Sequence, residues 1–210
     1  MYIKKTFIGK TLTKYKLGLK LTQIQRDIII GTLLGNACME YRDNKKFYSI
    51  KFEQSLEQME YLKHLYEILE PFIGMIPSIR EKNNSIWFRT DRHKKFKYYF
   101  NLFYKIDGDK LKKIIPKNLN KCINERVLAY WYMNNGSFNK IRKQYYLYTQ
   151  NFTYKENQKI IKILKLKYDL ELSIHKDKNK YKLYIKSISK NIFIKLIKPY
   201  IIKSMEYKLN

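Results

Sequence analysis

The chain has 210 residues, 45% of them apolar, so it can bury a core and is not a disordered tail. Its 44 Lys and Arg against 18 Asp and Glu give a formal charge of +26, which favours a polyanionic partner, nucleic acid above all. No apolar run approaches the ~20 residues that span a bilayer. Two cysteines in different halves, Cys38 and Cys122, indicate neither a zinc cluster nor a disulfide framework, and we expect buried, reduced thiols.

Two alternatives to nucleic acid as the reason for the charge stay open. An AT-rich genome enriches Lys, Ile, Asn and Tyr codons, and this chain is rich in all four residues. A protein that lies on acidic lipids would need a basic amphipathic helix with an apolar face to spare, whereas the apolar faces here are needed for the core. We therefore expect no membrane partner.

Residues 1–20 carry six lysines and no acidic residue. Transit peptides favour Arg and Ser, and this segment contains neither. We expect a basic arm along nucleic acid, although a terminus without a role fits nearly as well.

The first half of the chain predicts helices and hairpins in alternation. Thr22 is a plausible N-cap for the first helix, Ser55 for the second, and Pro71 stops the second. Apolar residues at intervals of three and four, among them Met59, indicate that the second helix covers a sheet. In order, we expect a helix at 21–36, strands at 39–42 and 47–53, a helix at 56–69, strands at 75–80 and 85–90, and a helix at 92–105.

The same order of elements repeats after a join marked by Gly108 and Pro116. We expect a helix at 125–135, strands at 137–142 and 145–151, a helix at 153–168, a hairpin over 170–187 and a helix at 189–200. This repetition predicts an α+β fold with an internal duplication, in which 21–115 and 116–210 are two αββαββα halves.

Two corresponding helices begin the halves with similar sequences. They are Ile29-Ile-Gly-Thr-Leu-Leu-Gly-Asn-Ala37 and Leu128-Ala-Tyr-Trp-Tyr-Met-Asn-Asn-Gly136. Apolar residues on every side of a helix indicate that it is buried all round, and Gly31, Gly35 and Ala129 are small enough for two backbones to approach closely. We therefore expect a central helix pair.

The pair resembles the two signature helices of the LAGLIDADG homing endonucleases, specifically the single-chain, intron-encoded mitochondrial kind. In that kind Leu-Ala-x-Trp-x-Met-x-x-Gly is a common form of the second motif. The resemblance extends over roughly 21–209 and includes Ile50-Lys-Phe-Glu-Gln54, Lys113-Ile-Ile-Pro116, Leu196-Ile-Lys-Pro-Tyr-Ile-Ile202 and Met205-Glu-Tyr-Lys-Leu209. It implies two antiparallel four-stranded sheets that form a saddle over DNA, with no homo-oligomer required.

The chain departs from this family where the family does its chemistry. In active members the eighth residue of each motif is acidic, and the two carboxylates hold divalent metal at the scissile phosphates; here these residues are Asn36 and Asn135. Two-metal cleavage needs anionic oxygen ligands that hold hard cations ~4 Å apart, which amides do poorly. Of the nearby acids Glu40, Asp43 and Glu53, only Glu40 is expected close to Asn36. We predict little or no catalysis and no metal or other cofactor.

Asn also tolerates the left-handed conformation at helix ends, so both residues are expected to keep a capping role. Lys113 and Lys208 match family lysines that lie near the scissile phosphates and assist catalysis. His64, His93 and His175 show no metal spacing, and we assign them no function.

The expected contacts with nucleic acid are basic side chains on the sheets and beside the helix ends. Some of the 20 Tyr and 11 Phe, interleaved with Lys in the strands, are available to stack on bases, whereas the others fill the core. The candidates are Lys51, Arg80, Arg89, Lys113, Arg142, Lys182, Lys186 and Lys208.

These observations favour an inactive LAGLIDADG scaffold that binds nucleic acid, with RNA favoured over DNA. It would act in mitochondria as an organelle-encoded intron maturase or as a subunit of an organellar ribonucleoprotein such as the mitochondrial ribosome, alongside other protein subunits. The alternative is a working endonuclease that uses Mg²⁺ to cut a long, specific DNA site. A saddle shaped for the wide major groove of B-DNA fits poorly into the deep, narrow one of RNA, so an RNA-bound form should use other basic faces or single-stranded loops.

Overall fold

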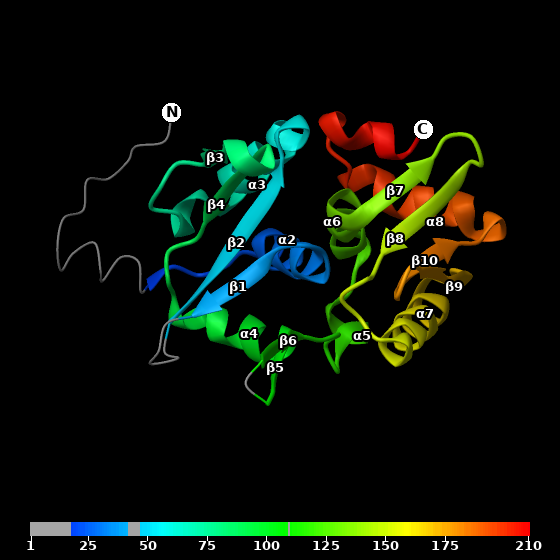
Figure 1. Cartoon of the computed structure of the whole chain (residues 1–210), viewed down its shortest axis with the longest axis horizontal. Helices are drawn as coiled ribbons and strands as arrows, with labels where there is room; N and C mark the ends of the chain where they lie inside the picture. The colour runs from blue at the N-terminus through cyan, green and yellow to red at the C-terminus, as the bar shows by residue number, and fades with distance from the viewer. Residues whose placement is uncertain (1–17, 42–46, 109) are drawn as a thin grey trace.

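The computed structural model describes residues 18–41, 47–108 and 110–210. Two sheets, each with its own helices, lie on either side of a central pair of helices (Figure 1). Most of the predicted basic arm, residues 1–17, lies outside the described residues.

The central helices are α2 (Gln23–Leu34) and α6 (Glu125–Asn135). Thr22 begins α2 with a capping box, in which its hydroxyl accepts from Gln25 N and the Gln25 side chain accepts from Thr22 N. Asn124 caps α6 through a hydrogen bond from Val127 N. Both helices are buried along most of their length, as the apolar runs predict.

The two central helices pack backbone to backbone at Gly31. A Cβ at this position would lie 2.7 Å from Val127 O and 2.8 Å from Tyr130 Cβ, closer than side chains approach. Ala129 is fully buried in the facing helix. The predicted close approach is confirmed, and it fixes how the two halves sit against each other.

Each half contributes a four-stranded antiparallel sheet with the same topology. The strands of the first sheet are β1 (Cys38–Tyr41), β2 (Tyr48–Ser55), β3 (Ser78–Arg80) and β4 (Ser85–Arg89), in the order β1-β2-β4-β3. Those of the second are β7 (Gly136–Asn139), β8 (Gln144–Tyr148), β9 (Leu172–Asp177) and β10 (Lys180–Ile185), in the order β7-β8-β10-β9. The identical order confirms the duplicated α+β fold.

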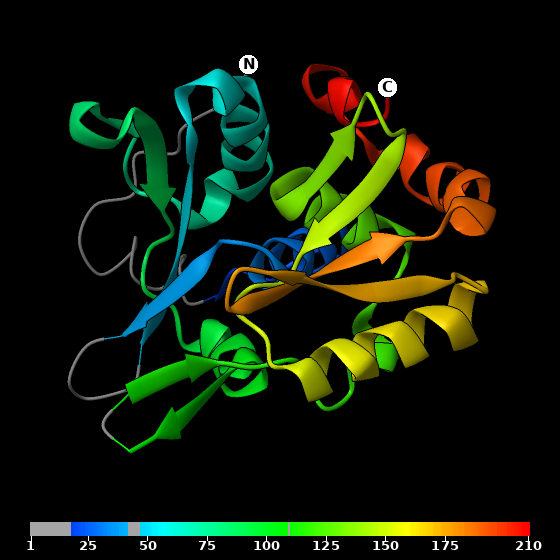
Figure 2. The same cartoon turned by 45° about the vertical axis from the view of Figure 1, so that its right-hand side comes forward.

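Helices pack on one face of each sheet, and the other face stays open (Figure 2). The outer helices of the first half are α3 (Met59–Leu69) and α4 (Lys97–Phe103), and those of the second are α7 (Tyr154–Tyr168) and α8 (Lys190–Ile197). Strand alternation separates the faces: Ile50 and Phe52 of β2 are buried in the core, while Lys51 and Glu53 point to the open face. Met59 was expected in the core but is 47% exposed, because α3 turns it to solvent.

The join between the halves contains a hairpin that was not predicted, β5 (Tyr104–Asp107) with β6 (Lys110–Lys113), followed by the short helix α5 (Leu119–Cys122). The helix predicted to reach Lys105 ends at Phe103. Met39 N donates to the Tyr104 hydroxyl at 3.0 Å, and the Tyr104 ring stacks on Phe100 with centroids 5.3 Å apart. These contacts hold Tyr104 in an extended conformation, whereas the Lys-rich β6 has no apolar alternation to predict a strand.

Three smaller expectations are corrected. The hydroxyl of Ser55 makes no cap hydrogen bond, and the chain passes through a 3-10 turn before α3. Neither Asn36 nor Asn135 has positive φ, so no left-handed cap is formed there. Cys38 and Cys122 are free but half-buried rather than buried, and this partial burial raises the pKa of both thiols.

Among the residues that the structure describes, none of the helices has both the length and the apolar character that a membrane span requires.

Candidate nucleic-acid interface

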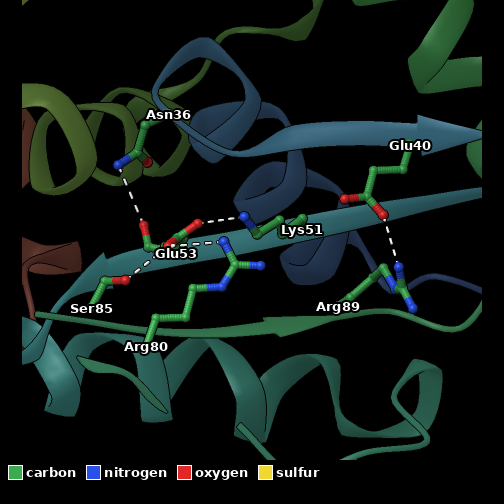
Figure 3. Close-up of polar contacts among 7 residues, drawn as sticks. All are labelled: Asn36, Glu40, Lys51, Glu53, Arg80, Ser85 and Arg89. Atoms are coloured by element: carbon green, nitrogen blue, oxygen red, sulfur yellow. Dashed lines mark hydrogen bonds and ion pairs between the residues drawn. The ribbon is translucent and has the colours of Figure 1, made fainter. Parts of the chain in front are cut away.

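The two central helices end, at what we call their feet, in side-chain amides that bind the sheets. Nδ2 of Asn36 donates to the main-chain oxygen of Glu53 in β2 at 3.4 Å (Figure 3). Nδ2 of Asn135 donates to the main-chain oxygen of Tyr148 in β8 at 3.3 Å. Because β2 and β8 hold equivalent places in the two sheets, each amide ties its helix to the second strand of its own half.

The two feet also contact each other through Asn134. Its Oδ1 accepts from Asn36 N at 3.4 Å and from Nε2 of Gln54 at 3.3 Å. A Cβ on Gly35 would lie 2.9 Å from the Cγ of Asn134 and from the Oδ1 of Asn135. The predicted need for a small residue at Gly35 is confirmed, and the groups that meet at the centre are neutral amides.

The structure brings Lys113 and Lys208 to the feet, one in each half. Nζ of Lys113 donates to the carbonyl oxygens of Gly35 at 2.9 Å and Ala37 at 2.7 Å, on either side of Asn36. Nζ of Lys208 donates to Met133 O at 2.5 Å. The carbonyls at a helix C-terminus lack partners within the helix and favour a cation. Burial lowers the pKa of each lysine to about 8.

The side chains of Asn36 and Asn135 offer only uncharged oxygen atoms as ligands for a metal ion. Mg²⁺ is held in proteins chiefly by carboxylate, phosphate and water oxygens. The amide nitrogens of Asn36 and Asn135 face main-chain carbonyls, which leaves one uncharged oxygen on each foot. Across residues 18–41, 47–108 and 110–210, no three or more His, Cys, Asp or Glu side chains form a group that could hold a metal ion. These residues do not fit the divalent metal that the family resemblance implies.

The acid beside the first foot is Glu53, which corrects the expectation of Glu40. The main chain of Glu53 contacts Asn36, whereas the carboxylate of Glu40 pairs with Nη1 of Arg89 at 2.9 Å (Figure 3). Asp43 lies outside the described residues.

The Glu53 carboxylate is fully engaged on the open face of the first sheet. Ser85 Oγ donates to it at 2.8 Å, Nζ of Lys51 donates to it, and Nη1 of Arg80 lies 3.7 Å away. Partial burial alone would raise the pKa of Glu53, but the hydrogen bonds from Lys51 and Ser85 and the charges of Lys51 and Arg80 outweigh it, so the pKa is lowered. Glu53 is therefore an anion paired with two cations.

Three predicted contact residues gather on this open face, and each is paired with an acid. Lys51 and Arg80 share Glu53, and Arg89 has Glu40. Lys51 and Arg80 also lie over the Trp87 ring, 5.6 and 4.8 Å from its centroid. The first sheet thus presents cations whose charge is largely balanced.

The open face of the second sheet is aromatic. Nζ of Lys182 lies 4.9 Å from the ring centroid of Tyr146 and 5.8 Å from that of Tyr148. The centroids of His175 and Tyr184 are 5.2 Å apart, and those of Tyr146 and Tyr184 are 5.5 Å apart. Strand alternation in the Tyr-Lys segments predicted such rings. The place of His175 among them was not predicted, because it depends on the register of β9 on β10, which the sequence does not show.

The last two predicted contacts lie apart from these clusters. Nζ of Lys186 is 3.8 Å from Oε2 of Glu171, beyond the end of β10. Arg142 is exposed in the turn between β7 and β8, where its main-chain nitrogen binds Oδ1 of Asn139 at 2.9 Å. Contact of any of the eight predicted residues with nucleic acid stays a prediction.

The motif helices, the duplicated sheets and the joined feet agree with one family of proteins. The model of the LAGLIDADG DNA endonuclease family matches residues 26–193, and the chain belongs to this family. The structure is similar to that of the homing endonuclease I-WcaI bound to its DNA recognition sequence, with a TM-score of 0.82 and 31% identity over 96% of this chain and 93% of that one.

Endonucleases and a maturase are among its sequence relatives. A probable intron-encoded endonuclease 1 of Wickerhamomyces canadensis is 32% identical and covers 90% of this chain and 85% of its own length. The cytochrome b mRNA maturase bI2 of Debaryomyces hansenii is also 32% identical and covers 87% of this chain and 72% of its own length. The N-terminal LAGLIDADG domain of WhiA shares the fold alone, at 14% identity and a TM-score of 0.52.

Proposed function

We propose that this protein is a LAGLIDADG scaffold without cleavage activity that binds RNA, as a mitochondrial intron maturase or as a fixed subunit of an organellar ribonucleoprotein such as the mitochondrial ribosome. The observation that carries the proposal is the pair of feet, where the Asn36 and Asn135 amides donate to strand carbonyls. Loss of one preorganised electrostatic group in an enzyme costs ~10²–10³ in rate, so loss of both anions leaves almost no catalysis.

Two further observations support RNA as the partner. Two relatives are named as mRNA maturases. The open face of the second sheet carries aromatic rings around Lys182, the chemistry on which unpaired bases stack. An organelle-encoded, mitochondrial origin is supported by the Lys- and Ile-rich composition and by relatives named as intron-encoded.

The test compares the natural protein with the Asn36→Asp/Asn135→Asp variant. Both are incubated in Mg²⁺ with a plasmid that carries the intronless insertion site of the protein's own gene, and both are crosslinked to total organellar RNA and DNA. We expect the natural protein to leave the plasmid intact and to recover RNA. Nicking by the natural protein at a rate near that of working family members would establish the endonuclease alternative instead.

A further inference from the structure

Two hollows share the short helix α5, which contributes Lys121 and Cys122 to the first and Asn120 to the second. The helices α4, α5 and α7 follow one another along one edge of the molecule (Figure 1). The first has a volume of about 550 Å³, and its cations are Lys20, Arg26, Lys95 and Lys121. The second has a volume of about 500 Å³, and its cations are Lys117, Lys159, Lys162 and Lys167. We call these eight residues the basic edge.

Within the lining of the two hollows, the charge of the basic edge is not balanced. Among the residues that line the two hollows, the one acid is Asp27, which is 2% exposed. Its carboxylate is already bound by Nη1 of Arg126 at 3.0 Å and by Nε2 of Gln23 at 2.7 Å. This differs from the first sheet, where each predicted contact residue has a carboxylate partner. Clustered cations without anions produce a potential that attracts a polyanion.

Three lysines of the basic edge are held in place by the main chain. Nζ of Lys159 donates to Pro116 O at 2.9 Å and to Lys117 O at 3.0 Å. Nζ of Lys167 donates to Ile123 O, and Nζ of Lys95 to Leu19 O. An ammonium has three N–H donors, so each keeps at least one for a ligand. The other cations of the two hollows, such as Lys162, are exposed.

The basic edge lies at the far end of the central helices from Asn36 and Asn135. The first hollow is lined by Gln23, Arg26 and Asp27 of the first turns of α2 and by the N-cap of α6. A helix of 12 residues, the length of α2, is ~18 Å long at 1.5 Å per residue. A ligand on the basic edge therefore does not compete with one between the sheets.

We propose that the basic edge is a second nucleic-acid site, which binds the phosphate backbone of RNA independently of the sheets. Phosphate contacts need cations at intervals and no base-specific groups, which is what the two hollows offer. Backbone and shape recognition is also how proteins bind structured RNA, whose narrow major groove excludes side chains. The proposal rests on the proposed binding of RNA but not on the loss of cleavage.

The test removes four charges from the basic edge without disturbing the main chain. Lys20, Lys117, Lys121 and Lys162 are changed to Gln, because none of their side chains binds a main-chain carbonyl of residues 18–41, 47–108 or 110–210. The matched control changes Lys63, Lys195, Lys198 and Lys203 to Gln, four exposed lysines on other elements that lose the same charge. Thermal unfolding verifies that both variants fold.

The probe is a fluorescein-labelled RNA hairpin with a stem of about 20 base pairs, which covers a site of the length that double-stranded RNA modules span. Its dissociation constant is measured at several salt concentrations. We expect the edge variant to bind the hairpin on the order of 100-fold more weakly than the natural protein. The slope of the logarithm of the binding constant against the logarithm of the salt concentration should fall in magnitude by about 3. We expect the control to change affinity by less than about 3-fold.

The outcomes separate this inference from the proposed function. If the natural protein does not bind RNA, the proposed function fails. If it binds RNA and the edge variant binds equally well, the second site does not exist. Vesicles of phosphatidylserine and phosphatidylcholine form a further arm: an edge variant that loses vesicle binding while it keeps RNA binding would assign the basic edge to a lipid surface instead.

Discussion

At the scale of single residues, the change from an acid to an amide alters what the helix feet can contact. An amide nitrogen donates to the strand carbonyl beside it, whereas a carboxylate at the same place would set two oxygens against each other. The sequence predicted the loss of charge at Asn36 and Asn135. It contained no sign of this new hydrogen bond, which depends on where β2 and β8 pass the feet.

We expect Asn36→Asp to destabilise the protein more than Asn36→Ala does. Both lose the hydrogen bond to Glu53 O, but Asp adds a negative charge at a helix C-terminus, for a difference of about 1 kcal/mol in the free energy of unfolding. Urea unfolding in buffer with EDTA measures both variants without any metal. An Asp variant as stable as the natural protein would show that the amide is not a structural contact.

The buried lysine at the second foot makes stability depend on pH. An unfolded lysine keeps its proton up to about pH 10.4. Burial lowers the pKa of Lys208 to about 8, so this residue binds more protons in the unfolded chain between pH 8 and 10, and its own contribution to stability rises with pH in that window. We expect Lys208→Met to remove this part of the rise when urea unfolding is followed from pH 7.5 to 9.5.

Lys203→Met is the control for this measurement, because Lys203 is exposed and its substitution removes the same charge. It should keep the pH dependence of the natural protein. The window stops at pH 9.5 since burial raises the pKa of tyrosines such as Tyr130, to about 12, which opposes the trend at higher pH. An identical rise in Lys208→Met and the natural protein would contradict a buried ammonium.

At the scale of elements, the central helix pair depends on one glycine. Ala has a higher helix propensity than Gly by about 1 kcal/mol, so Gly31→Ala would stabilise an isolated helix. Here its Cβ would meet Val127 O at 2.7 Å, and we expect a net loss of about 1–3 kcal/mol in the free energy of unfolding.

Gly18→Ala is the matched control, because a Cβ at Gly18 has no neighbour within 4 Å among the residues that the structure describes. We expect it to leave the melting temperature unchanged or slightly raised. A Gly31→Ala variant more stable than the natural protein would mean that α2 and α6 do not pack as closely as the structure has them.

The order of elements could be predicted because each half repeats the same periodic pattern, and the span of α6 was predicted to the residue. The hairpin that begins at Tyr104 was not predicted, because its first strand is held by a contact with Met39, which is far away in the chain. The same limit applies to the open faces. Residues such as Lys51 were predicted there from strand alternation, but their pairing with carboxylates is set by the sheet register.

At the scale of the whole molecule, the distribution of charge differs from what a count of residues suggests. The formal charge of +26 predicts a polyanionic partner but not its place. On the first sheet the predicted cations have acidic partners, while the basic edge has none among its lining residues except the buried Asp27. The sequence does not reveal this contrast, because the eight cations of the edge come from segments between Lys20 and Lys167.

The bonds from the two amides to the strands have an evolutionary consequence. A lineage that regained one acid, say at Asn36, would place a carboxylate against the carbonyl oxygen of Glu53 at the helix end, while the other foot, Asn135, still had no acid to help hold a cation. Under the proposed loss of cleavage, each single reversal would weaken the fold without restoring a metal site. Two changes would then have to occur together, and we expect adaptation to proceed more readily on surfaces away from the feet.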